Sequence, residues 1–232
     1  MSMSSRERVL AAINHREPDR VPIDLGGEAN TGIAAGTYTR LRERLGIEGE
    51  PAKVFDVEQM LAWVEQPVIE ALGVDVLPIQ KLNQAYGMRL DSWRPWHLDD
   101  GTQVQMPSRF DPVTEPDGSL GIYLNGEMVA KKVPISPYFD PMKEFKFYDP
   151  LPSVETLEMW VFTDEELEWA RRWAETLRAE TDKALIGDPG VSLTRWSSYQ
   201  EWLYTIAADP AYVLAFYDRK VENMLTNLEL YA

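Results

Sequence analysis

Three short runs of mostly aliphatic residues, separated by helical patterns, constrain the fold of this chain most. The runs lie at 21–25 (Val-Pro-Ile-Asp-Leu), 74–78 (Val-Asp-Val-Leu-Pro) and 183–187 (Lys-Ala-Leu-Ile-Gly). Short buried strands that alternate with helices are typical of an α/β protein with a parallel sheet. The sequence therefore predicts an α/β fold in which these runs are the parallel core strands.

Helix signals fill the stretches between these runs. Ser4 and Glu7 have capping-box spacing, in which the N-cap and the third helical residue satisfy each other's backbone amides. Thr163 and Glu166 repeat that spacing, and Asp209 precedes a proline that suits the first helical position. We expect helices after Ser4, over 37–45, 56–72 and 197–207, from about 153 to 182, and from 209 onward.

The region from 89 to about 150 has a different pattern. Turn sequences such as Asn125-Gly126 separate short runs at 102–106, 120–124 and 127–131. Asn-Gly between two such runs favours a tight hairpin, because both residues tolerate a positive φ. The sequence predicts an antiparallel β insertion over about 89–150.

The charge balance and the lack of cysteine exclude several classes of protein. The chain has 232 residues, a formal net charge of −15 at pH 7 and no cysteine. So acidic a chain lacks the basic surface that binds nucleic-acid phosphates, and without cysteine it has no disulfide or Cys-containing zinc site. No apolar run spans a membrane, and no signal core follows the N-terminus. We expect a cytoplasmic protein that binds neither nucleic acid nor membrane.

The number of strands fits only part of a barrel. A closed (β/α)8 barrel typically needs about 250 residues without a large insertion. Here the three units and the insertion use all 232 residues, and the last of them still read as an amphipathic helix. We expect residues 1–232 to be the N-terminal part of a partial (β/α)8 TIM-type barrel. The chain would end before the barrel closes, and a C-terminal part or a partner chain would complete it.

The opening residues carry a family resemblance. Residues 6–24 read Arg-Glu-Arg-Val-Leu-Ala-Ala-Ile-Asn-His-Arg-Glu-Pro-Asp-Arg-Val-Pro-Ile-Asp. This stretch resembles the amino-terminal signature of the uroporphyrinogen decarboxylase superfamily, and it is most similar to the branch of corrinoid-dependent methyltransferases. Residues 25–27, 55–56 and 72–76 are also similar to that branch. The resemblance implies a (β/α) barrel whose site lies at the carboxyl ends of the strands.

The resemblance also implies cofactors and partners. Methyl-transferring members use a zinc ion held by His and Cys to activate a thiol acceptor, and their methyl group passes through a corrinoid protein. Those zinc ligands belong to the second half of the family's barrel. We therefore expect no metal on this chain alone, and we expect His15 and His97 not to be zinc ligands. Zinc and a corrinoid belong to the complete enzyme that the resemblance implies.

The candidate catalytic residues are Asp24 and Asp188, because each lies at or just after the end of a predicted strand. Barrel active sites are built at those ends, so we expect both carboxylates in one mouth. Either aspartate also fits a turn in which its carboxylate accepts a backbone amide, and the sequence leaves both interpretations open. The residues expected to contact a substrate are Gly26, Gly27, Asn30, Trp196 and Tyr199.

Three functions from different classes remain open. The first is methyl transfer between a small methyl donor, a corrinoid protein and a thiol-type acceptor. The second is decarboxylation of uroporphyrinogen, for which decarboxylase members have an arginine-rich loop after the first strand. At that place this chain has Asp24 and Glu28, which would repel a porphyrinogen decorated with carboxylates. The third is a non-catalytic fragment or binding subunit that completes a barrel with a partner.

Overall fold

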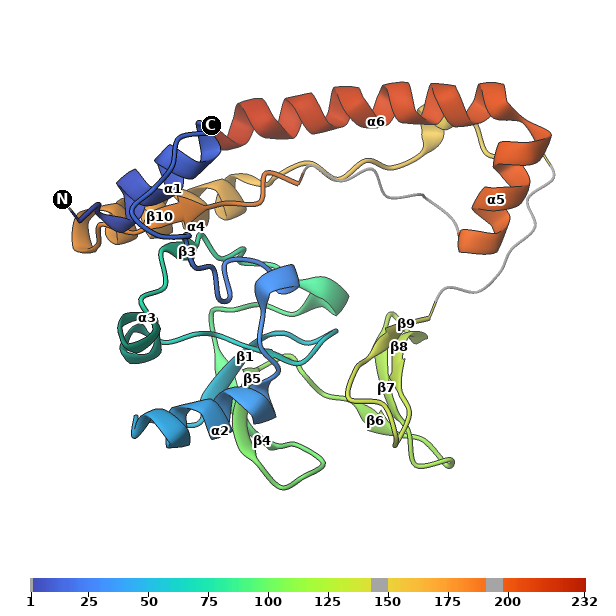
Figure 1. Cartoon of the computed structure of the whole chain (residues 1–232). Helices are drawn as coiled ribbons and strands as arrows, with labels where there is room; N and C mark the ends of the chain where they lie inside the picture. The colour runs from blue at the N-terminus through green and yellow to red at the C-terminus, as the bar shows by residue number, and fades with distance from the viewer. Residues whose placement is uncertain (1, 143–149, 191–197) are drawn as a thin grey trace. The chain divides into compact units, whose positions relative to one another are not determined.

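A computed structural model describes residues 2–142, 150–190 and 198–232 and shows a mixed α/β protein (Figure 1). The α-helices are α1 (Ser5–Ile13), α2 (Ala35–Leu45), α3 (Gln66–Leu72), α4 (Asp164–Glu180), α5 (Tyr199–Ala208) and α6 (Pro210–Tyr231). The strands are β1 (Ala52–Asp56), β2 (Leu61–Ala62), β3 (Val76–Pro78), β4 (Trp93–His97), β5 (Gln103–Pro107), β6 (Val113–Thr114), β7 (Leu120–Leu124), β8 (Glu127–Lys132), β9 (Asp140–Pro141) and β10 (Ala184–Ile186). Short 3-10 helices are η1 (Ala29–Thr31), η2 (Ala85–Gly87) and η3 (Val154–Thr156).

The chain divides into two compact units. The first unit contains residues 1–141 and 169–187, and the second contains residues 142–168 and 188–232. All of the strands belong to the first unit, whereas α5 and α6 belong to the second.

Two of the three expected core strands form the predicted parallel pair. In the first unit β10 pairs with β3, with Leu185 opposite Leu77. The third run, 21–25, is not a strand, so that prediction is wrong. Pro22 has no amide hydrogen, and the Ile23 amide donates to the Asp75 carboxylate at 2.8 Å instead of to a neighbouring strand. One ladder-like bond remains, from the Asp75 amide to the Ile23 carbonyl at 2.8 Å.

The predicted helix starts are confirmed where side chains cap them. The Ser4 and Ser198 hydroxyls each accept the amide of a glutamate three residues later, and both capping boxes are complete. Thr163 and Glu166 form the same reciprocal bonds at the start of α4. The helix expected from about 153 is wrong in its first part, because only the short η3 forms before α4 begins at Asp164.

The helix expected over 56–72 is also wrong in its first half. Residues 52–56 form β1, which lies between β2 and β5, and only 66–72 are helical. The Asp56 carboxylate accepts the Gln59 amide at 2.7 Å and makes a turn, and Met60 has a φ of 56°. A turn of this kind cannot continue a right-handed helix.

The antiparallel region is confirmed in its strands but differs in its arrangement. The Asn125-Gly126 turn joins β7 to β8, and both residues have positive φ values, 52° and 84°. However, the hairpin of β4 and β5 joins β1 in a parallel pairing, so it extends the sheet β2-β1-β5-β4. Only β6 to β9 form a separate antiparallel sheet, and residues 143–149 of the expected insertion lie outside the described part.

Helix α2 contacts β1 and packs Tyr38, which is fully buried, onto the core of the first unit.

None of the described sheets closes into a barrel, since they have two or four strands each. Among the described residues, no helix is both long and apolar enough to cross a membrane.

Candidate functional site

The loop after residue 23 is held by its own backbone. The half-buried Asp24 accepts the Gly27 amide on Oδ1 at 2.9 Å, and the Gly26 amide donates to the Thr31 carbonyl at 2.9 Å. Gly26 has a φ of +82°, and a Cβ there would lie 2.8 Å from Cγ2 of Val64. In these contacts the Asp24 carboxylate caps a turn, which is one of the two interpretations that the sequence leaves open. They place Asp24 at the base of a tight loop beside the buried Gly26 and Gly27.

This loop carries negative charge. Glu28 is exposed, and its backbone amide and carbonyl both bond to the Thr31 hydroxyl, while Asn30 is exposed within η1. No basic residue lies between 24 and 31. A polyanionic ligand would meet two carboxylates and no countercharge from the loop itself.

A buried ionic network fixes the segment that leads into this loop. Nη1 of Arg8 and Nη1 of Arg20 each lie 2.6 Å from the Asp75 carboxylate, whose side chain is fully buried. Asp19 binds the other side of the Arg8 guanidinium at 2.6 Å. Because a buried charge must be paired to be tolerated, these residues lock α1 and the segment 19–23 onto the residue that precedes β3.

The network changes the pKa values of both aspartates. Burial raises the pKa of Asp75, but hydrogen bonds from Arg20, the Ile23 amide, Ser5 and Arg8 outweigh it and lower the pKa to about 2. For Asp19, the hydrogen bond from Arg8 and then the Met3 amide hold the pKa well below its usual range. Both groups are therefore charged at neutral pH and serve as structural anions.

The predicted residues of the last third lie in the second unit. Oδ1 of Asp188 accepts the Gly190 amide at 2.8 Å, which is again a turn contact. Tyr199 is the first residue of α5 and is 62% exposed, and Trp196 lies outside the described residues. Since Asp24 and Asp188 belong to different units, their meeting in one mouth stays a prediction.

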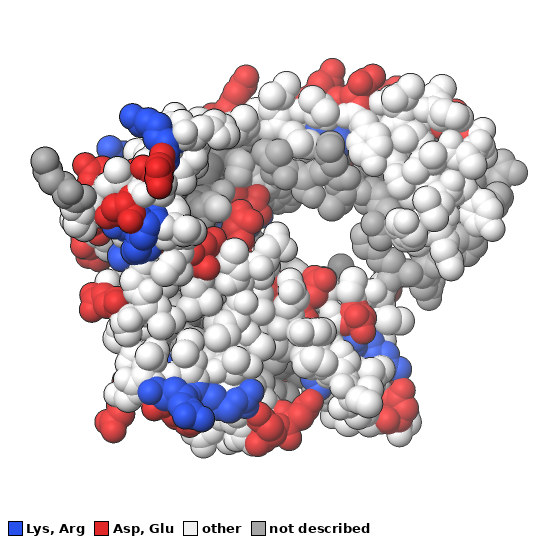
Figure 2. Space-filling view, viewed as in Figure 1, with Lys and Arg blue, Asp and Glu red and all other residues white. Residues whose placement is uncertain are grey.

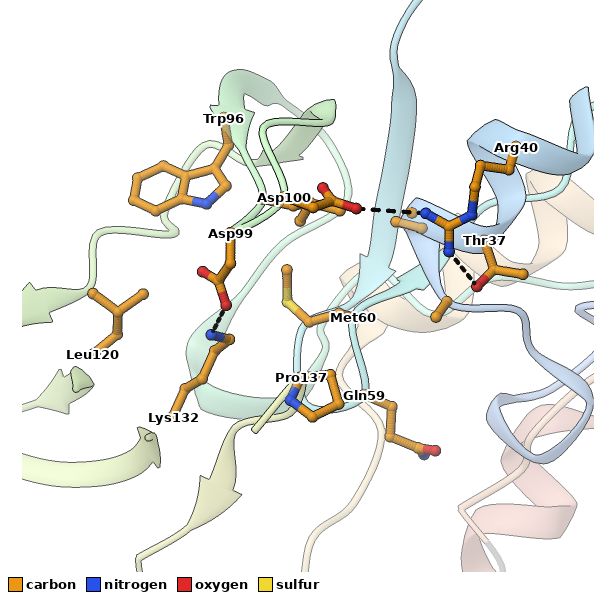
Figure 3. Close-up of a pocket in the computed structure, with 14 residues that line it drawn as sticks. Thr37, Arg40, Gln59, Met60, Trp96, Asp99, Asp100, Leu120, Lys132 and Pro137 are labelled. Atoms are coloured by element: carbon orange, nitrogen blue, oxygen red, sulfur yellow. Dashed lines mark hydrogen bonds and ion pairs between the residues drawn. The ribbon is translucent and has the colours of Figure 1, made fainter. Parts of the chain in front are cut away.

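Sequence reasoning missed a cavity in the first unit. It has a volume of about 270 Å³ and lies where the start of α2 faces the turn between β4 and β5 and the strands β7 and β8 (Figure 3). Its apolar wall includes Met60, Trp96 and Leu120. Its charged groups are two ion pairs, Lys132 with Asp99 and Arg40 with Asp100.

The chemistry of this cavity is set by its balance of charge. Lys132 is buried and its ammonium group is neutralised by Asp99, while Arg40 also donates to the Thr37 hydroxyl at 3.3 Å. On the face seen in Figure 2, basic side chains gather over α2, which carries Arg40, Arg42 and Arg44. An apolar wall with charged groups at one side suits a small molecule with a polar end.

The histidines do not form a metal site in the structure. His15 and His97 are both exposed, at the end of α1 and at the end of β4. Within the described ranges, no three His, Cys, Asp or Glu residues lie close enough to hold a metal ion. The described residues therefore do not fit the zinc that the sequence resemblance implies.

No family model, curated protein or solved structure matches this chain.

Proposed function

We propose that this chain is part of a uroporphyrinogen decarboxylase-like protein that transfers a methyl group. The transfer would run between a small methyl donor, a corrinoid protein and a thiol-type acceptor. In this proposal β3 and β10 are two strands of a (β/α) barrel, and the loop of Asp24 lies at its mouth. The corrinoid and the metal are held by a partner or by residues other than those described.

The observation that carries the proposal is the placement of the opening signature. Its Arg8, Asp19 and Arg20 are the residues that meet at Asp75, directly before β3. These residues of the signature thus form one ion-pair network. The chain leads from this network to Asp24, which lies in a glycine loop next to the parallel pair. A loop anchored in this way is held rigid, which suits contact with a ligand.

The acidic loop favours methyl transfer over decarboxylation of uroporphyrinogen. Asp24 and Glu28 face no basic residue within the loop, and the nearby Arg8 and Arg20 are already neutralised by Asp19 and Asp75. A substrate with many carboxylates needs unpaired guanidinium groups, which bind carboxylates in pairs of hydrogen bonds. A neutral or cationic methyl donor has no such need.

Two parallel assays test the proposal. The complete protein, including the part that holds the metal, is incubated with methylcobalamin and 2-mercaptoethanol in one assay and with uroporphyrinogen in the other. We expect a methyl thioether in the first, formed when the thiolate sulfur takes the methyl carbon and the Co–C electron pair stays on cobalt. Loss of carboxylate groups from uroporphyrinogen would instead support the decarboxylase. Activity in neither assay would favour the non-catalytic binding subunit.

A further inference from the structure

The second unit contains a groove with an unusual buried carboxylate. The groove has a volume of about 720 Å³ and lies between the segment 150–155 and the helices α5 and α6. Glu201 lines it, and this residue is only 4% exposed. Such burial is rare for a glutamate that forms no ion pair with any of the described residues.

The two oxygens of Glu201 differ in their contacts. Oε2 closes the capping box of α5, where it accepts the Ser198 amide at 3.4 Å and the Ser198 hydroxyl at 3.3 Å. Oε1 is buried and has no hydrogen-bond partner among the described residues. A buried carboxylate oxygen accepts hydrogen bonds only, and leaving it unpaired costs stability. This oxygen therefore calls for a donor that the described residues do not supply.

The surroundings of Glu201 are negative and aromatic. Glu155 and Asp209 line the same groove, and of the described residues that line it none is basic. Arg219 lies beside the groove, where its guanidinium donates a hydrogen bond to the Val154 carbonyl. Its positive charge also attracts the Glu155 carboxylate. Tyr204 and Tyr212 also line the groove, and aromatic rings attract cations. Burial, Asp209 and Glu155 together raise the pKa of Tyr212, as expected where the local potential is negative.

We infer that this groove binds a small alkylammonium ion whose N–H group donates to Oε1 of Glu201. The ammonium group is the donor, Glu155 and Asp209 add attraction, and the tyrosines cover the alkyl part. The same chemistry is offered by a free amine and by a lysine side chain. This site lies in the second unit and does not depend on the proposed methyl transfer.

Saturation-transfer NMR titrations of the full chain test the site with n-butylammonium as the probe. The first variant is Glu201→Gln, which keeps the capping box because glutamine also fits its third helical position. We expect its affinity to fall about tenfold or more, since a hydrogen bond to a buried charge is lost. The matched control is Glu222→Gln on the exposed side of α6, which we expect to bind within about twofold of the native chain because surface charges are screened.

Three further probes define the ligand. n-Butanol keeps the alkyl chain without charge, and butyltrimethylammonium keeps the charge without an N–H group, so both should bind much more weakly. Nα-acetyl-lysine methylamide shows whether the natural ligand is a free amine or a lysine side chain of a protein. A site for a free amine prefers butylammonium, whereas a site for a protein lysine prefers the lysine compound. The inference is overturned if butylammonium does not bind saturably, if Glu201→Gln binds it as tightly, or if either isostere matches it.

Discussion

Nη1 of Arg8 lies 2.6 Å from Oδ1 of Asp75, a residue 67 positions away whose side chain has no exposed surface. The same carboxylate also binds Arg20 and the Ile23 amide. Through this one side chain, helix α1 and the segment before the Asp24 loop are tied to the start of β3. The position of the candidate loop therefore depends on Asp75.

Replacing Asp75 should destabilise the protein strongly. Asp75→Asn keeps the size of the side chain but leaves the buried Arg8 guanidinium short of a countercharge. We expect a loss of roughly 3 kcal/mol in the free energy of unfolding, as is usual when one partner of a buried pair is removed. Urea denaturation measures it. The control Asp111→Asn removes an aspartate that is 88% exposed and pairs with Arg94 at the surface, so it should change little. Equal effects of the two variants would contradict the role of the network.

The same network predicts a loss of stability in acid. The pKa of Asp75 is lowered to about 2 in the folded protein, below the usual aspartate value of about 3.9 in an unfolded chain. Its contribution is therefore fully present above pH 4 and is lost as the pH falls towards 2. Denaturation series at several pH values should show this decline, and the decline should be shallower in Asp75→Asn. A native chain whose stability is constant from pH 5 to about 2 would contradict the prediction.

Alanine substitutions at two glycines with the same φ distinguish the cost of backbone strain from the cost of steric overlap. Gly26 and Gly101 both have a φ of +82°, but a Cβ on Gly26 would overlap Val64, whereas nothing lies within 4 Å of a Cβ on Gly101. Gly101→Ala should cost about 1 kcal/mol from the left-handed conformation alone. Gly26→Ala should cost clearly more, because Val64 must also move. Thermal unfolding compares the two, and equal costs would mean that the Asp24 loop relaxes without resistance.

Local features of the fold could be predicted from the sequence, because they depend on neighbouring residues. The caps at Ser4, Thr163 and Asp209 and the Asn125-Gly126 hairpin are of this kind. The parallel pair of β3 and β10 followed from two aliphatic runs between helical patterns.

Features that depend on distant partners could not be predicted. β1 was not predicted, because its burial depends on β5, which lies about fifty residues later in the chain. In the sequence, Asp75 is one polar residue in a predicted strand. Its ion pairs could not be predicted because its partners Arg8 and Arg20 are 67 and 55 positions away. The cavity beside Lys132 is built from several separate segments, and no single stretch of sequence contains its pattern.

The rate of methyl transfer in Asp24→Asn tests the central claim most directly. The complete protein, including the part that holds the metal, receives methylcobalamin labelled with carbon-13 in its methyl group, together with 2-mercaptoethanol, and NMR follows the labelled thioether. Asparagine keeps the hydrogen bond from the Gly27 amide but removes the charge, so the free energy of unfolding should be nearly unchanged. We predict a rate at least about tenfold below that of the native protein and of the surface control Asp111→Asn, which is the size of effect expected for a charged group at a reacting centre. A labelled thioether formed equally fast by Asp24→Asn, or none formed by the native protein, would contradict the account.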